Sequence, residues 1–202
     1  MGLRDRKKEQ TRAALTSAAL RLADERGLDH VTVEEISAAA EVSSRTFFNY
    51  FATKDDAILG APVIDSATVC ERLLALPREV PIIDAVLRVF APAIELMQAD
   101  RELWLLRMRV IKNNPSLLLA LFARGAVEEQ QFVAAVATRV GLTPEDTFPQ
   151  LAAVATGAAF RVAMMRWTTA GPDGRLSDLV REAFGMLAAG LADPAPTDEE
   201  VA

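Results

Sequence analysis

The sequence contains very few of the residues on which catalytic and metal sites depend. Its 202 residues include one cysteine, Cys70, and one histidine, His30. A single cysteine excludes an intrachain disulfide and a multi-cysteine zinc site. The chain also lacks a Gly-x-Ser-x-Gly elbow, a glycine-rich phosphate loop and a metal-spaced His/Cys cluster. We therefore expect neither an enzyme nor a protein that needs a cofactor or a metal.

Long apolar segments are also missing. The longest wholly apolar run, residues 183–192, has about half the length that a membrane span needs. The N-terminus lacks the apolar segment of a signal peptide. These features predict a soluble, cytoplasmic protein without a membrane partner.

The chain lacks an overall excess of positive charge, since its net charge is −6 and its pI is near 5.0. The charge is unevenly distributed, however. Residues 1–55 hold nine basic and nine acidic side chains, so the acidity lies in the rest of the chain. The first twelve residues are locally basic, which suits contact with a phosphate backbone but equally suits a solvated tail. The acidic pI therefore does not exclude a nucleic-acid partner.

Helical spacing of apolar residues dominates the sequence, and strand patterns are nearly absent. The spacing predicts an all-α fold of nine to ten helices. They cover about residues 5–26, 32–40, 44–50, a helix that begins near 54, 65–76, 82–99, 101–112, 115–140, a helix from 144 or 146 to 169, and 176–191. We expect a helix-turn-helix domain in residues 1–53, a ligand-binding and dimerisation domain in 54–192, and a disordered acidic tail in 193–202. Pro62 is expected to bend or end its helix.

The most informative segment is residues 31–54, which predicts two short helices joined by a tight turn. Thr32 and Glu35 have the spacing of a capping box, and Ser43 is a good N-cap for the second helix. The inward positions are apolar: Ile36, Val42, Phe47 and Phe51. The outward positions carry short polar groups, one guanidinium and aromatic rings, which suit base edges and phosphates: Ser44, Arg45, Thr46, Phe48, Asn49 and Tyr50. This is the pattern of a DNA-reading helix-turn-helix.

The residues from Arg45 to Asp56 resemble the recognition helix and following turn of the tetracycline-repressor (TetR) family. Upstream residues fit the same pattern, so the resemblance covers about residues 6–59: Arg12, Ala13, Ala18, Ala19, Leu22, Gly27 and Val31–Val33. The resemblance implies that Thr32 and Lys54 face phosphates and that the outward residues of the second helix line the major groove. Arg45 departs from the small residue or proline often found at its position. It either reads a guanine or contacts a phosphate.

Two further sites are expected in the C-terminal part. The last two helices are rich in small residues, which allow close helix packing. They predict a four-helix dimer interface with contacts from Val154, Gly157, Phe160, Met164, Phe184 and Leu187, although the same residues can close the monomer core. The middle helices predict an apolar effector pocket lined by Phe90, Ile94, Met97, Trp104, Met108, Leu121, Phe122 and Trp167. Core packing is the alternative for each of these residues.

Four cations also lie on the helix of residues 101–112: Arg101, Arg107, Arg109 and Lys112. They either meet a carboxylate, phosphate or thioester head group of a ligand, or they pair with nearby acids such as Asp100. Together the features predict a homodimeric repressor that an apolar effector releases from a palindromic double-stranded DNA operator. A weaker resemblance to family members that sense long-chain acyl-CoA suggests one class of effector. The alternative is a helical carrier of lipids or other apolar ligands that does not bind DNA.

Overall fold

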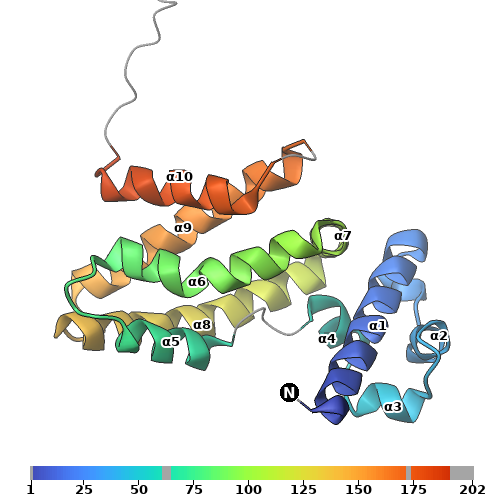
Figure 1. Cartoon of the computed structure of the whole chain (residues 1–202). Helices are drawn as coiled ribbons and strands as arrows, with labels where there is room; N and C mark the ends of the chain where they lie inside the picture. Colours follow the sequence, from blue (N-terminus) through green and yellow to red (C-terminus); the bar gives the residue numbers. More distant parts are fainter. Residues whose placement is uncertain (1, 61–64, 172–173, 192–202) are drawn as a thin grey trace, which may run out of the picture. The chain divides into compact units, whose positions relative to one another are not determined.

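The computed structural model describes residues 2–60, 65–171 and 174–191. These residues form ten α-helices and one 3₁₀ turn (Figure 1): α1 (Leu3–Arg26), η1 (Leu28–His30), α2 (Val33–Ala39), α3 (Ser44–Phe48), α4 (Lys54–Leu59), α5 (Ser66–Ala75), α6 (Ile82–Ala99), α7 (Arg101–Lys112), α8 (Pro115–Val140), α9 (Thr147–Thr169) and α10 (Leu176–Ala188). The all-α prediction is confirmed. The predicted bend at Pro62 and the acidic tail lie outside the described residues.

Most predicted helix ends agree with the structure, but the second helix of the helix-turn-helix is shorter than expected. α3 ends at Phe48 instead of near Tyr50. The backbone N–H of Asn49 bonds to the carbonyl of Thr46, three residues earlier, at 3.1 Å. This i→i−3 bond tightens the last turn and ends the regular helix.

The chain forms two compact units, which we describe separately. The first unit comprises residues 1–65 and 99–127, and the second comprises 66–98 and 128–202. α8 contributes its first half to the first unit and its second half to the second. These units are defined by contacts in space. They do not test the domain boundaries predicted at residues 53 and 192, which stay predictions.

The core of the first unit joins the N-terminal helices to α7 and the start of α8. Leu15 and Leu20 of α1, Ile36 of α2 and Phe47 of α3 are fully buried. The same cluster contains residues of α4, α7 and α8: Ala57, Ile58, Val110, Ile111 and Leu117. Burial of each large side chain stabilises the fold by about 1.5–3 kcal/mol. The residues that the sequence predicted as scaffold are confirmed as core, with Val42 half-buried at its edge.

The second unit is built from α5, α6, the second half of α8, and the paired helices α9 and α10 (Figure 1). Small residues let α9 approach α10 closely, because Ala159 and Ala163 are buried on its inner face. Trp167 is fully buried and its indole Nε1 donates to the carbonyl of Gly174 at 3.1 Å. An ion pair between Arg166 and Glu182, with 2.7 Å between Nη1 and Oε1, joins the two helices at the surface.

A buried arginine closes the end of α5 in the second unit. The side chain of Arg139 is 5% exposed, and its guanidinium donates to four backbone carbonyls. Nη1 bonds to Leu73 and Leu76, and Nη2 bonds to Pro77 and Val80, over 2.5–3.1 Å. The guanidinium therefore satisfies the C-terminal carbonyls of α5 and of the turn that follows it.

Two further features of the second unit concern Cys70 and α9. Burial raises the pKa of the Cys70 thiol, which agrees with a packing residue rather than a reactive thiolate. Among the described residues, α9 is the one helix whose length and apolar composition would allow it to cross a membrane. Core helices of soluble proteins meet the same criterion, and one face of α9 is packed within this unit.

Candidate nucleic-acid interface

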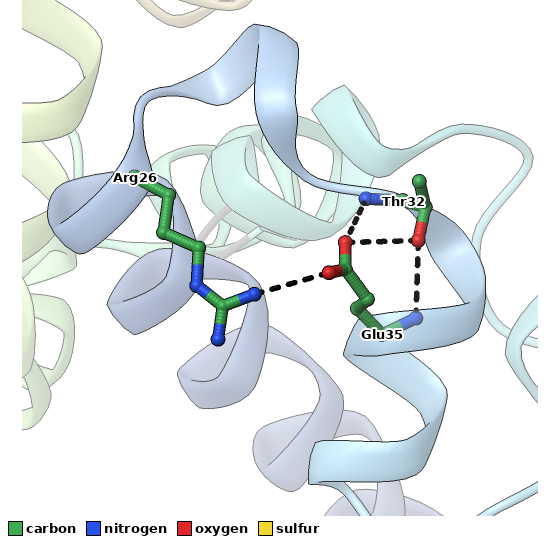
Figure 2. Close-up of polar contacts among 3 residues, drawn as sticks. All are labelled: Arg26, Thr32 and Glu35. Atoms are coloured by element: carbon green, nitrogen blue, oxygen red, sulfur yellow. Dashed lines mark hydrogen bonds and ion pairs between the residues drawn. The ribbon is translucent and has the colours of Figure 1, made fainter.

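The two short helices of the helix-turn-helix are fixed by side chains that cap their N-termini. At α2 the hydroxyl of Thr32 accepts from the N–H of Glu35 at 3.2 Å, and the Glu35 carboxylate accepts from the N–H of Thr32 at 3.0 Å (Figure 2). Arg26 of α1 reaches the same carboxylate at 3.0 Å. The predicted capping box is confirmed. The backbone N–H of Thr32 holds the pKa of Glu35 below its ordinary value, and the Thr32 hydroxyl and Arg26 act in the same direction.

The candidate recognition helix α3 is held at both ends. The Ser43 hydroxyl accepts from the N–H of Thr46 at 3.1 Å, which confirms the predicted N-cap. At the other end Arg12 of α1 donates to the Tyr50 carbonyl at 3.5 Å, and its guanidinium carbon lies 5.0 Å from the centre of the Phe51 ring. The helix is therefore tied to α1 by contacts that do not use its outward face.

The predicted DNA-contacting residues of α3 and of its C-terminal turn are either exposed or half-buried. Arg45 and Asn49 are exposed, and Phe48 is 57% exposed although its ring meets the buried Phe47 edge to face. Ser44, Thr46 and Tyr50 are half-buried. An exposed guanidinium, an exposed amide and an exposed ring give this segment the donors, acceptors and stacking surface that groove contacts require.

Lys54 and Thr32 both make contacts within the protein that the sequence did not predict. The Nζ of Lys54 donates to the carbonyl of Leu28 at 2.7 Å and to that of Val31 at 3.0 Å. The Thr32 hydroxyl also donates to the carboxylate of Glu35 at 3.0 Å. An ammonium group has three protons, so these bonds leave Lys54 one donor for a phosphate.

A second capping box, at the start of α4, was missed from the sequence. The Thr53 hydroxyl accepts from the N–H of Asp56 at 3.1 Å, and the Asp56 carboxylate accepts from the N–H of Thr53 at 2.9 Å. Its Thr-x-x-Asp spacing has the signature that identified Thr32 and Glu35. The box fixes the point from which Lys54 reaches back to the loop before α2.

The eight predicted effector residues are divided between the two compact units. In the first unit Met108 and Leu121 pack on the core, Trp104 is half-buried, and Phe122 is 63% exposed. In the second unit Ile94 and Trp167 are buried, and the other two are half-buried: Phe90 and Met97. The ring of Phe90 lies 6.1 Å from that of Phe132 and 6.4 Å from that of Phe160. Each half of the set has an apolar environment, and a shared pocket stays a prediction.

The predicted dimer residues differ widely in their exposure. Val154 is exposed, Phe184 is buried within the second unit, and the rest are half-buried: Gly157, Phe160, Met164 and Leu187. The structure also shows exposed apolar residues on α9 that the sequence analysis did not single out. Leu151 is 62%, Val162 is 52% and Met165 is 70% exposed. Their helical spacing was the available signal, but periodicity alone does not tell which stripe of an apolar helix faces outward.

A short helix that is capped by Ser43, held by Arg12 and exposes polar residues defines a helix-turn-helix DNA-binding protein. Comparisons with known proteins agree. Residues 15–59 match the family model of bacterial regulatory proteins of the tetR family, and residues 80–192 match the MftR C-terminal domain. The transcriptional regulator TcmR of Streptomyces glaucescens is 32% identical over 174 residues, which are 82% of this chain and 76% of that protein. The chain therefore belongs to the TetR family.

Solved structures show the same fold. FadR of Thermus thermophilus, a TetR-family repressor in complex with lauroyl-CoA, has a TM-score of 0.56 at 22% identity, over 92% of this chain and 99% of that one. NalD, the secondary repressor of the MexAB-OprM multidrug efflux pump in Pseudomonas aeruginosa, has a TM-score of 0.58 at 18% identity, over 89% and 96%. Its family, shown by the matching family models and by the similarity to TcmR, makes the chain a DNA-binding transcriptional regulator and not an enzyme. This excludes the alternative of a carrier that does not bind DNA.

Proposed function

We propose that the protein is a cytoplasmic, homodimeric repressor that a small apolar effector releases from a palindromic operator. The observation that carries this proposal is the exposed set on the recognition segment, held by Ser43 and Arg12 on the buried core of the first unit. In this proposal Arg45, Asn49 and Phe48 contact the major groove together with Ser44, Thr46 and Tyr50. Thr32 and Lys54 contact backbone phosphates that border this groove.

Dimerisation is supported by the apolar residues that α9 exposes. Leu151, Val154, Val162 and Met165 are all exposed and recur at helical spacing, together with the half-buried Ala158. An exposed apolar stripe of this kind marks an interaction surface. A two-fold axis would pair it with its own copy, as in most homodimers. One recognition helix reads too few bases for specificity, so two must bind half-sites about 34–36 Å apart.

Coupling between effector and DNA is supported by the composition of the first unit. α7 contributes Val110 and Ile111 to the same core as the N-terminal helices, and the Nε of Arg109 lies 2.9 Å from the carboxylate of Asp24 on α1. An effector that moves α7 would therefore move the scaffold of the recognition helix. Such coupling is worth about 1–3 kcal/mol in typical cases.

The proposal is tested by fluorescence anisotropy with DNA from upstream of the protein's own gene. We expect a discrete, salt-sensitive complex with two protomers per site, and light scattering should show a dimer in solution. Val162→Glu should break the dimer and the specific complex, whereas Gln150→Glu, at an exposed position beside the stripe, should not. A monomer that still binds its operator specifically would contradict the proposal.

The effector is tested with a panel of apolar molecules that includes lauroyl-CoA, the ligand named for the Thermus FadR structure. We expect at least one member to lower operator affinity by about tenfold, which corresponds to about 1.4 kcal/mol of coupling. Acyl-CoA is the first class to test, because the sequence resemblance suggests it. An unchanged melting temperature and unchanged DNA binding with all acyl-CoAs would remove that class.

A further inference from the structure

A basic and aromatic cluster lies in the first unit, where α7 and α8 meet the end of α4. The guanidinium of Arg107 rests on Gly60 so closely that a Cβ there would lie 3.1 Å from its Nη2. Arg124 of α8 donates to the Gly60 carbonyl at 2.9 Å. The guanidinium carbon of Arg107 lies 5.4 Å from the centre of the Trp104 ring. Two guanidinium groups therefore contact one glycine, and an indole lies beside one of them.

Two donors of this cluster are buried without a partner. Among the described residues, neither the Nε of Arg107 nor the Nε1 of Trp104 has a hydrogen-bond acceptor. Buried donors in folded proteins nearly always have acceptors, so each exception requires an explanation. Burial lowers the pKa of Arg107, the carboxylate of Asp100 opposes this shift, and the positive charge of Arg124 adds to it. The two donors are therefore the unsatisfied feature of the cluster.

The protein itself shows how a purely structural arginine is accommodated. Arg139 is also buried, but its guanidinium donates to four carbonyls. Arg107 has no comparable set of acceptors, and Arg124, which bonds to the Gly60 carbonyl, adds charge of the same sign. Contacts within the described protein therefore leave the Nε of Arg107 unsatisfied, whereas a bound anion would supply an acceptor for it.

We propose that this cluster binds the anionic group of the effector, so that the effector is an amphipathic organic anion with a carboxylate or a phosphate. The inference rests on the proposed function, because it assigns a chemical class to the effector. Arg107 and Arg124 bind the anion, and the indole N–H of Trp104 supplies a further donor.

The position of the cluster connects anion binding to the DNA-binding helices. Arg107 lies on α7 within one turn of Arg109, which pairs with Asp24 of α1, and of Val110 and Ile111 in the shared core. A ligand that draws Arg107 and Arg124 toward one anion would shift α7 and the end of α4. Both helices pack on α1 in the same unit.

The test compares three probes that share an alkyl chain: octanoate, octyl phosphate and octanol. Binding is followed by tryptophan fluorescence, since Trp104 and Trp167 are the chain's two tryptophans. We expect octanoate or octyl phosphate to bind at least about tenfold more tightly than octanol, because the anion gains charge-assisted hydrogen bonds. Arg107→Met should remove that difference, and Trp104→Phe should remove the fluorescence response. Lys112→Gln, which removes an exposed charge from the same helix, should keep both.

The relative response to the two anions identifies the source of the group, since a preference for octyl phosphate indicates a phosphorylated effector and a preference for octanoate a carboxylic acid. Equal binding of octanol and both anions, or an unchanged preference in Arg107→Met, would overturn the inference.

Melting temperature gives a second measurement. Arg107→Met should melt at a higher temperature than the wild type without ligand, because a half-buried charge whose Nε has no acceptor is removed. A lower melting temperature with unchanged anion binding would assign Arg107 a structural role.

Failure of the inference can be distinguished from failure of the proposed function. If the wild type binds its upstream DNA as a dimer but the anions neither bind nor release it, only the inference fails. If the anions bind at Arg107 but no specific DNA complex forms, the anion site stands and the repressor proposal fails.

Discussion

The two compact units satisfy the ends of their helices in different ways. In the first unit the caps are local: Thr32, Ser43 and Thr53 each bond to a residue three positions later. In the second unit α9 and α10 begin without a side-chain cap, and the end of α5 is held by Arg139, which lies more than fifty residues away along the chain. The short helices of the first unit thus begin at local caps, whereas the end of α5 in the second unit depends on a long-range contact.

The difference follows from helix length and from function. α2, α3 and α4 have seven, five and six residues, and isolated helices of that length are unstable in water. Local caps fix them individually and leave the outward face of α3 free for DNA. α9 and α10 have 23 and 13 residues and gain stability from packing along their length.

The largest effect is expected where the second unit depends on a single residue. Arg139→Met should lower the free energy of unfolding by about 3 kcal/mol, because four carbonyls lose a charged donor. Denaturant unfolding measures the loss, and hydrogen exchange should locate it at the end of α5. Arg139→Lys, which keeps the charge but not the forked geometry, should lose less. A loss below about 1 kcal/mol for Arg139→Met would show that these carbonyls find other donors.

The next effect concerns the surface that the local caps position. Arg45→Ala should cost about 2 kcal/mol of operator affinity and relax the preference at one base pair, if the guanidinium reads a guanine. Anisotropy with single-base operator variants measures this. Arg45→Lys is the matched control, because a lysine replaces a phosphate contact but not a bidentate base contact. Equal losses on specific and random DNA would make Arg45 a phosphate contact only.

Predictability from the sequence follows the range of each contact along the chain. The sequence revealed the Thr32–Glu35 box, the Ser43 cap and the buried positions of Ile36, Phe47 and Phe51, since each depends on spacing within a few residues. Helix bounds in the second unit were also predictable, because prolines, glycines and periodicity mark them.

Contacts between distant residues were not predictable. Nothing in the sequence links Arg139 to Leu73, or Arg107 and Arg124 to Gly60. The bond from Lys54 to the carbonyls of Leu28 and Val31 was missed for the same reason. The sequence also left open which apolar face of α9 is exposed, because the helix is apolar on most of its sides.

Lys54 makes one of the long-range contacts within the first unit, and its replacement should give a smaller effect. Lys54→Met should lower the free energy of unfolding by about 1.5 kcal/mol, because two carbonyls lose a charged donor. If its third proton also meets a phosphate, the salt dependence of DNA binding should fall by about one unit of slope. Unfolding and salt titration separate the two roles. An unchanged slope would remove Lys54 from the DNA contacts, and an unchanged stability would contradict the bonds to the loop.

The smallest expected effect is on the capping box of α2, where it shows whether the charge of the Glu35 carboxylate contributes to stability. The Thr32 N–H, the Thr32 hydroxyl and Arg26 hold the pKa of Glu35 below its ordinary value of 4.5. Between the lowered pKa and 4.5 the unfolded chain binds more protons at this group than the folded chain does. The carboxylate therefore stabilises α2 fully above that range, and this contribution disappears as the pH falls through the lowered pKa.

Glu35→Gln keeps an acceptor for the Thr32 N–H but removes the charge. The difference in unfolding free energy between the two proteins should thus be largest near neutral pH and shrink in acid. A difference that is independent of pH would show that the cap acts by geometry alone, and the contrast between the units would then rest on contact range and not on charge.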